Sequence, residues 1–445
     1  MNDLTLPLSG LSSVGGKSVV ARFDGSMLSS NSGVLALAEV EKRLRVAERL
    51  ARCIDDPRCP DQVIHSVADM IGFRMKMIAA GYEDGNDANR LRCDPVFKMA
   101  QDALPSGRDL ASQSTMCRLE NLPGVRELVV MGRAMVDLYC SSFRQVPKRI
   151  VLDIDDTFDA VHGGQQWRLF NAHYDGYGFQ PIVVFDGDGR FVGAVLRPAK
   201  RPSGAEIRPH LRRLVRAIRS NWPNTGILIR ADGHYCSPQV IDWCRANDVD
   251  FILGVAPTTT LRKHVADLET STMARFEAKK TNKVRRFKEF FDGAASWSRV
   301  ERIIARVEVG AQGADTRFIV TNLASGKAKA LYEDVYCRRG AAENHIKSWK
   351  THLAADRTSC TRATANQFRL FLHAGAYWLM WGLRAAMPKR SSFAVAQFDT
   401  LRLRLIKIAA RVVEMKTQIR LHLPTSCPDQ RILRIVLSRI PQLAT

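Results

Sequence analysis

The chain has 445 residues, 46% of them hydrophobic, which is enough for two or three domains with cores of their own. Its formal net charge of +21 and pI near 9.9 indicate a polyanionic partner, either nucleic acid or an anionic membrane surface. The N-terminal MNDLTLPLSG has neither the basic start nor the apolar run of a signal peptide. The most apolar segment, 370–387, contains His373 and Arg384 and is predicted to be a buried core helix, which disfavours a membrane protein.

The ten cysteines are scattered, and no two of them form a CxxC pair. This pattern argues against a zinc knuckle and against the disulfide framework of a secreted domain. We therefore expect reduced thiols and a cytoplasmic protein.

Residues 1–146 are predicted to form a mainly helical N-terminal DNA-binding domain. Apolar residues recur there at spacings of three and four, as expected for amphipathic helices. The segments with this pattern are 37–54, 62–79 and 125–143.

The hydrophobic pattern of the sequence changes at residue 147, where short apolar strands begin to alternate with helical patterns. The alternation predicts an α/β domain, with 147–262 as its first part. Expected strands cover 149–157, 182–185, 191–196, 226–232 and 251–256, and expected helices cover 204–222 and 238–247.

Two of these strands end in aspartate, at Asp153-Ile154-Asp155 and at Asp232. Strands that lie side by side bring such carboxylates to one edge of the sheet, where they repel unless a divalent cation lies between them. Strand-end aspartates also cap turns, and we retain that reading for other acids nearby. Asp153 and Asp155 point to the same face of their strand, so either is a candidate for the first acid.

Residues 263–332 are predicted to form a β-rich basic insertion, with strand-like pieces at 302–307 and 317–320. Phenylalanines interleave with its basic run, which favours DNA contact over a plain solvated face. The candidate DNA-binding residues are Lys279, Lys280, Lys283, Arg285, Arg286, Lys288 and Trp297.

A predicted helix at 336–350 carries four chemically different groups on one stripe, in the domain assigned to 333–365. At about 100° per residue, Tyr336, Arg339, Glu343 and Lys350 fall within roughly 60° of one another. This set suits a phosphodiester, because a carboxylate can hold a divalent metal while the other three groups hold phosphate oxygens.

The last region, 366–445, is predicted to be basic and helical. Residues 351–445 contain 15 Lys or Arg against 4 Asp or Glu, and 402–420 is expected to form a basic amphipathic helix.

The spacing of Tyr336, Arg339, Glu343 and Lys350 matches the signature of a large group of bacterial insertion-sequence DDE transposases. The stretches VLDIDDTFDAVHGGQQWRLFNAHYDGYGFQPIVVF, LRPAKRPSGAE and RADGHYCSPQVIDWC most resemble insertion-sequence family 1380, as does the opening SVGGKSVVARFDGSMLSSNSGVLALAEVEKRL. The resemblance covers nearly the whole chain. One departure is Gly340, where many relatives of the wider group carry tryptophan.

This resemblance implies an RNase H-like catalytic domain, interrupted by the β-rich insertion and flanked by helical N-terminal and C-terminal regions. The implied activity is DNA cleavage at terminal inverted repeats and strand transfer into target DNA. Asp155, in an Asp-x-Thr context like the family's first-acid motif, would act with Asp232 and Glu343, and Asp153 is the alternative first acid. Two Mg²⁺ ions per active site, with Mn²⁺ as a substitute, would be held by these acids.

Tyr336, Arg339 and Lys350 would bind DNA phosphates, and Trp297 would take up an unstacked base. The implied partners are terminal-repeat and target DNA, with a homodimer in the DNA complex and a nucleoid-associated location in a bacterial cytoplasm. Two alternatives remain open: an RNase H-like metal nuclease without strand transfer, and an inactive DNA-binding repressor derived from a transposase.

Overall fold

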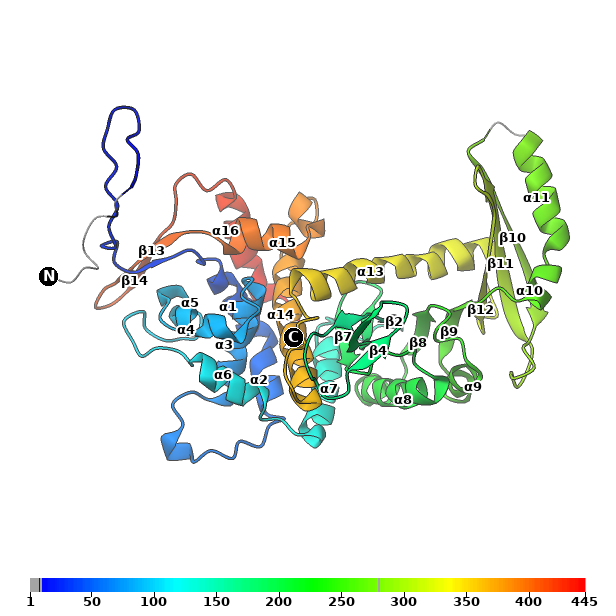
Figure 1. Ribbon diagram of the computed structural model, residues 1–445, viewed down its shortest axis with the longest axis horizontal. Coiled ribbons are helices and arrows are strands. Elements are labelled where there is room, and N and C mark those ends of the chain that lie inside the picture. Colours follow the sequence, from blue (N-terminus) through cyan, green and yellow to red (C-terminus); the bar gives the residue numbers. More distant parts are fainter. Residues whose placement is uncertain (1–7, 9, 279–280, 445) are drawn as a thin grey trace. The chain divides into compact units, whose positions relative to one another are not determined.

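The computed structural model describes residues 8, 10–278 and 281–444, which divide into two compact units (Figure 1). The first unit contains 56–119 and 379–443 together with the described residues up to 51. The second unit contains the described part of 120–378 together with 52–55 and 444. The ten cysteines form no disulfide.

The first unit is mainly helical. The predicted helix over 37–54 is divided between α1 and α2, because Arg45 between them adopts a left-handed backbone conformation with φ of 53°. A small antiparallel sheet has the order β1-β13-β14. The main elements of this unit are β1 (Leu28–Ser29), α1 (Val34–Leu44), α2 (Val46–Ala51), α3 (Val67–Ala79), α4 (Ala88–Leu91), α5 (Pro95–Met99), α6 (Gln113–Glu120), α15 (Phe398–Leu401), β13 (Ala410–Glu414), β14 (Ile419–His422) and α16 (Gln430–Arg439).

The prediction of one basic helix over 402–420 is wrong. A π-helical turn (Arg402–Ile406) follows α15, and the chain then forms the β13–β14 hairpin. The reason is visible in the buried residues Ile406, Ile408, Ala410 and Val412, which recur with a period of two. That period belongs to a strand, and here it outweighs the helical spacing of the basic residues.

The second unit is built on an eight-stranded mixed sheet with the order β10-β11-β12-β9-β8-β2-β6-β7, which confirms the predicted α/β class. Strands β2, β8 and β9 run parallel, and the remaining neighbours pair antiparallel. The strands are β2 (Arg149–Asp156), β6 (Ile182–Asp186), β7 (Phe191–Val195), β8 (Gly226–Ala231), β9 (Asp250–Val255), β10 (Lys283–Asp292), β11 (Glu301–Gly310) and β12 (Gly313–Thr321). A second small sheet contains β3 (Asp159–Ala160), β4 (Leu169–Asn171) and β5 (Gly176–Phe179).

The strands expected within 302–307 and 317–320 are present as parts of β11 and β12. They continue the large sheet, because β12 pairs antiparallel with β9 from Phe318↔Val255 to Thr321↔Ile252. The helices α10 (Thr259–Lys263) and α11 (Ala266–Ala278) connect β9 to these strands, and α11 lies beside them (Figure 1).

Three further helices of the second unit contribute buried residues: α7 (Val125–Ser141), α8 (Gly204–Asn221) and α9 (Pro238–Ala246). In α8 the residues Ile207, Leu211, Val215 and Ile218 are buried and form one stripe. Ser203 begins this helix with a capping box, in which its side chain accepts from the backbone N–H of Glu206.

The predicted helix at 336–350 is helical but irregular. The segment comprises α12 (Ala328–Ala330), a π-helical turn (Leu331–Tyr336), a 3₁₀ turn (Cys337–Arg339), α13 (Gly340–Lys347) and a second π-helical turn (Ser348–His352). These changes of helical period break the single stripe that a regular α-helix would give, and π-helical turns occur frequently at functional sites.

The predicted buried helix over 370–387 is confirmed by α14 (Ala363–Ala385), which begins in the second unit and ends in the first. Among the described helices, none combines the length and apolar composition needed to cross a bilayer.

Candidate active site

The parallel pairing of β2 with β8 brings two candidate acids to one edge of the sheet. Ile154 is paired with Ala231, so Asp155 and Asp232 follow at the next position on neighbouring strands. The carboxylate of Asp232 also accepts a hydrogen bond of 2.9 Å from the backbone N–H of His234. The predicted meeting of strand-end carboxylates therefore occurs for Asp155 and Asp232.

The carboxylate of Asp153 is paired with an arginine instead. In the β2–β8 register it lies opposite Arg230, whose Nε and Nη2 donate to its two carboxylate oxygens, both at 2.7 Å. Both side chains are buried, and Arg230 Nη1 also donates to the carbonyl of Val335 at 2.7 Å. Burial raises the pKa of Asp153, although Arg230 opposes the rise. Asp153 thus forms a buried ion pair that connects two strands to the helical segment.

Asp155 is paired with the helical segment instead. Arg339 Nη1 donates to Asp155 Oδ2 at 2.7 Å. Burial raises the pKa of Asp155 to about 6; Arg339 opposes this rise, and the neighbouring charge of Asp232 adds to it. Tyr336 lies close enough to Arg339 and Asp232 to interact with both. Burial raises the pKa of its hydroxyl, Arg339 lowers that pKa, and the charge of Asp232 raises it. Two of the four signature residues therefore lie beside the acid pair.

Asp156 and three side chains around it, none of them among the predicted site residues, complete this edge. Tyr235 donates from its hydroxyl to Asp156 Oδ1 at 3.3 Å, and Gln180 donates to the other oxygen of Asp156. Burial and the charges of the surrounding aspartates raise the pKa of Tyr235, which keeps its hydroxyl protonated as a donor. His234 Nδ1 lies 3.5 Å from Asp156 Oδ1 and 3.8 Å from Asp232 Oδ2. In the sequence, only the Gly-His-Tyr run directly after Asp232 could have indicated that these residues belong to the site.

Lys350 contacts the segment that follows the first acid. Its Nζ donates to Thr157 Oγ1 at 3.1 Å and to the carbonyl of Phe158, and it lies 3.5 Å from Asp159 Oδ1. Among the described residues, neither carboxylate oxygen of Asp159 has a hydrogen-bond partner, and burial raises the pKa of Asp159 to about 8. Lys350 thus holds the chain just beyond β2.

Glu343 stands apart from the other two acids. It is exposed on α13, and within the described residues it makes no hydrogen bond or ion pair. No three His, Cys, Asp or Glu side chains in the described part of the chain form a group that could already hold a metal ion. Asp155 and Asp232 offer the hard oxygen ligands that Mg²⁺ prefers, so two of the three expected acids fit a divalent cation in this arrangement.

Most of the described basic side chains in the insertion already bind other groups of the protein. Arg285 pairs with Glu308 at 2.5 Å and with Glu333 at 2.6 Å, and Lys283 lies 3.5 Å from Glu308. Arg286 donates to Ser271 Oγ and Lys288 to the carbonyl of His264, both at 2.6 Å. Lys279 and Lys280 lie outside the described residues, and Trp297 is half-buried in the connection between β10 and β11.

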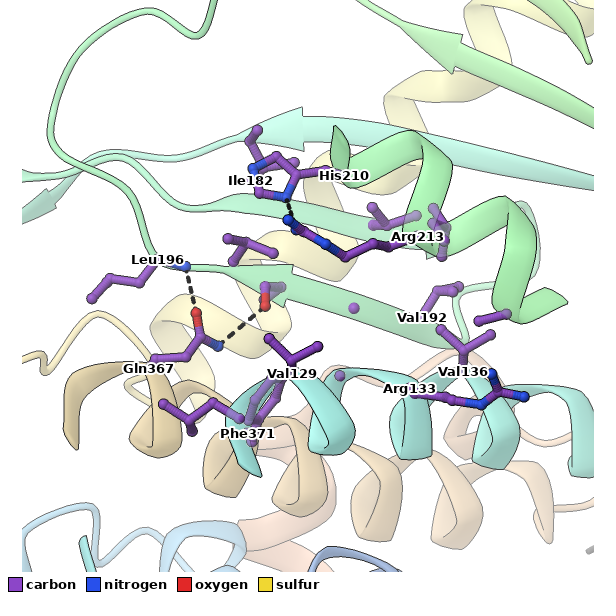
Figure 2. Close-up of a pocket in the computed structure, with 18 of the residues that line it drawn as sticks. Val129, Arg133, Val136, Ile182, Val192, Leu196, His210, Arg213, Gln367 and Phe371 are labelled. Atoms are coloured by element: carbon purple, nitrogen blue, oxygen red, sulfur yellow. Dashed lines mark hydrogen bonds between the residues drawn. The ribbon is translucent and has the colours of Figure 1, made fainter. Parts of the chain in front are cut away.

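A mostly apolar hollow of about 470 Å³ lies among α7, α8, β6, β7 and the start of α14 (Figure 2). Gln367 borders it, accepting from the backbone N–H of Leu196 at 2.7 Å and donating to the carbonyl of Ala194 at 3.2 Å. Ile154 and Tyr235, which neighbour the acids in sequence, also line the hollow. It therefore reaches the back of the acidic edge, and its mostly apolar lining includes the polar side chains of Arg133, His210 and Arg213 (Figure 2).

The second unit thus presents an acidic site at the edge of a mixed α/β sheet, with cationic groups supplied by a helical segment. Comparison with protein families defines the chain further. The model of the family "Transposase DDE domain group 1" matches residues 11–445, and the chain belongs to this family. It is therefore a transposase, an enzyme of DNA transposition, and DDE transposases generally use divalent metal ions.

No curated protein matches the chain. Among solved structures, the cryo-EM structure of the piggyBac transposase synaptic complex with hairpin DNA is similar, with a TM-score of 0.42 and 10% sequence identity. The similarity covers 92% of this chain and 85% of that chain.

Proposed function

We propose that this transposase cuts DNA at the terminal inverted repeats of a bacterial insertion sequence and joins the freed ends to target DNA. The observation that carries the proposal is the pairing of β2 with β8, which puts Asp155 and Asp232 side by side at the sheet edge. The strand order β7-β6-β2-β8-β9 around this edge supports an RNase H-like core. The spacing of Tyr336, Arg339, Glu343 and Lys350 supports the wider signature group, and the stretches quoted above support insertion-sequence family 1380.

In this proposal Asp155, rather than Asp153, is the first acid. Asp153 has both carboxylate oxygens engaged by Arg230 in a buried pair, whereas Asp155 and Asp232 are partly exposed. A buried and fully paired carboxylate is poorly available to a metal ion or to DNA. Asp155 and Asp232 would hold the divalent metal, with Mg²⁺ the ion that best suits carboxylate ligands.

Glu343 is the proposed third acid. It lies four residues after Arg339, which contacts Asp155, and residues four apart on a helix are neighbours about 5–6 Å apart. Glu343 therefore lies about one helical turn from Arg339, and it would join Asp155 and Asp232 when metal and DNA bind. When bound, Mg²⁺ would supply an activated water and charge stabilisation at the leaving oxygen.

The cationic groups of the helical segment would orient DNA beside the acids. Arg339 can hold a phosphate in a bidentate manner, and Tyr336 can donate a hydrogen bond from its hydroxyl. Lys350, which contacts Thr157 and Phe158, would combine phosphate binding with support of the chain after β2. Trp297 and the basic run remain proposed DNA contacts, and a homodimer remains the proposed form of the DNA complex.

Cleavage of DNA carrying the ends of the element tests the proposal. The native chain would be compared, in Mg²⁺, with Asp155→Asn, Asp232→Ala and Glu343→Ala, and with Asp334→Ala as control. Asp334 is an exposed acid on the same helical segment, with no hydrogen bond or ion pair among the described residues. The three site variants should bind the ends without cutting them, while the control should cut normally.

Each contrary outcome points to a different function. If the site variants cut as well as the native chain, these acids are not the catalytic ones. If the native chain cuts but never joins strands, it is a metal nuclease. If it binds the ends specifically and never cuts, it is a repressor.

A further inference from the structure

The surface of α8 carries a stripe of arginines that the proposed site does not use. Arg208, Arg212 and Arg216 follow one another at intervals of four residues. At about 100° per residue they lie within roughly 80° of one another, and each step advances about 6 Å along the helix. The only acid in α8 is Glu206, in its first turn, so the rest of the helix is strongly cationic.

These three side chains are exposed, and none of their guanidinium groups makes a hydrogen bond or ion pair within the described residues. Several arginines elsewhere in the same unit are paired with carboxylates, such as Arg285 with Glu308 and Arg302 with Glu289. Three neighbouring arginines without carboxylate partners repel one another, which favours an anion that binds across all of them.

The stripe begins near the acidic edge. Arg201, three residues before the start of α8, donates from Nη2 to the carbonyl of Gly233 at 3.1 Å, directly after Asp232. Gly204, the first residue of α8, lies against Ser237, because a Cβ built on it would be 2.2 Å from Ser237 Oγ. The N-terminal end of α8 is thus anchored beside the chain that follows β8, and the arginines continue from there along the helix.

The apolar stripe of α8 faces the protein core, so it cannot enter a bilayer. Ile207, Leu211 and Val215 are buried, and each immediately precedes an arginine of the exposed stripe. Membrane-surface helices bind by inserting such an apolar face. A stiff polyanion with regularly spaced charges suits the exposed stripe better, and guanidinium groups are well matched to phosphates.

We propose that Arg208, Arg212 and Arg216 bind the phosphodiester backbone of a DNA duplex that extends from the catalytic edge along α8. This inference rests on the proposed function, since it requires DNA at the acid pair. The distance from the first to the third arginine is about 12 Å, which spans several phosphates at 3.4 Å of rise per base pair. The duplex can be a terminal repeat or target DNA, because both present the same backbone.

The test is the salt dependence of DNA binding by the full chain without divalent metal, measured by fluorescence anisotropy. The variant R208Q/R212Q/R216Q would be compared with R431Q/R434Q/R439Q, which removes the same charge from the exposed arginines of α16. One labelled duplex would carry the ends of the element and another an unrelated sequence. Three lost phosphate contacts should reduce the slope of log K against log salt by about 2.7.

The proposal is supported if the α8 variant loses this slope on at least one duplex while the α16 variant retains the native slope. The duplex that is affected identifies which DNA lies along α8. An unchanged slope for the α8 variant on both duplexes, or equal losses in both variants, overturns it. Failure of the native chain to bind either duplex would instead contradict the proposed function.

Two further variants test the proposal even if the triple glutamine variant misfolds. R208K/R212K/R216K preserves the charge and should retain most of the native slope. R212Q alone should reduce the slope by about 0.9 if the triple variant does not fold. If R212Q keeps the native salt slope, or if the lysine variant loses the full slope, these arginines do not bind the DNA backbone through their charge.

Binding to anionic phospholipid vesicles separates DNA from a membrane surface. The α8 variant should bind these vesicles as the native chain does. Selective loss of vesicle binding with unchanged DNA binding would overturn the proposal.

Discussion

The guanidinium of Arg339 lies 2.7 Å from the carboxylate of Asp155, so a cation from the signature segment already pairs with the proposed first acid. Burial disfavours the charge on Arg339, but Asp155, Tyr336 and Asp232 together outweigh this effect and raise the pKa of Arg339. In the proposed site a divalent metal and Arg339 would therefore compete for the same carboxylate. The segment proposed to hold phosphate is thus already paired with the proposed metal ligand in the DNA-free chain.

Replacing Arg339 with glutamine should increase the affinity of the DNA-free chain for Mn²⁺ several-fold, because a competing cation is removed from Asp155. The measurement is the free Mn²⁺ signal in electron paramagnetic resonance at about pH 8, where a carboxyl with a pKa of about 6 is ionised. The same variant should bind DNA ends more weakly.

Arg338→Gln is the matched control, since the side chain of Arg338 is exposed and makes no hydrogen bond or ion pair in the described part of the chain. It should leave Mn²⁺ affinity unchanged. Weaker Mn²⁺ binding by Arg339→Gln than by the native chain would show that Arg339 supports the site rather than competing for it.

Replacing Arg230 with methionine should destabilise the protein by about 3–5 kcal/mol, because it leaves Asp153 buried without its partner. Asp153→Leu combined with Arg230→Met should recover much of that loss, since a buried ion pair can be replaced by apolar groups at little cost. Urea unfolding measures both effects.

This experiment also separates the two candidate first acids. Asp153→Asn should lower the free energy of unfolding, whereas Asp155→Asn should abolish cleavage in a protein that still folds. An Asp153→Asn variant with native stability and no cleavage would make Asp153 the catalytic residue.

The sequence predicted what local patterns determine and missed what depends on tertiary contacts. The apolar runs that end at Asp155 and Asp232 were sufficient to place both acids at a sheet edge, because parallel strands end on the same side. The ion pair of Asp153 depends on the β2–β8 register, which no pattern in either strand specifies. The exposed position of Glu343 depends on an irregular helix, and a fixed period of 100° per residue cannot represent it. The partners of Arg285 come from a distant strand and turn, so the basic run in the sequence did not reveal that Arg285 is already paired with two carboxylates.

Gly254→Ala should impair cleavage strongly, because the new methyl group has no room beside the acid pair. A Cβ at Gly254 would lie 2.8 Å from the hydroxyl of Tyr336, 3.0 Å from the backbone nitrogen of Gly233 and 3.3 Å from the carbonyl carbon of Asp232. The Tyr336 hydroxyl must therefore shift, and the backbone next to Asp232 must yield by a few tenths of an ångström. Catalytic rates depend steeply on the positions of active-site groups, so cleavage should slow. Single-turnover cleavage of pre-bound DNA ends measures the effect.

The control is Gly193→Ala in β7, where a Cβ would meet nothing within 4 Å. This substitution should retain native cleavage. If both alanine variants cut at the native rate, the close packing of Gly254 against Tyr336 and Gly233 is not required for the reaction.

Asp159→Asn should change how stability depends on pH. Burial raises the pKa of Asp159 in the folded chain to about 8, whereas an unfolded aspartate titrates near 3.9. Between these values the folded state retains a proton that the unfolded state has lost, so the contribution of Asp159 to stability is complete at low pH and is lost as pH rises toward 8. The asparagine variant has no such proton, and its free energy of unfolding should exceed that of the native chain by an amount that grows with pH.

This difference in the free energy of unfolding should grow by at most about 1.4 kcal/mol per pH unit, because a single proton is involved. It should level off above about pH 8. Urea unfolding at several pH values, on both chains, gives this difference directly. Asp334→Asn, which removes the same charge from an exposed position, should show no such trend. A difference that stays constant across this range would mean that Asp159 is ionised in the folded protein. Its 3.5 Å approach to Lys350 would then be a charged pair that compensates burial.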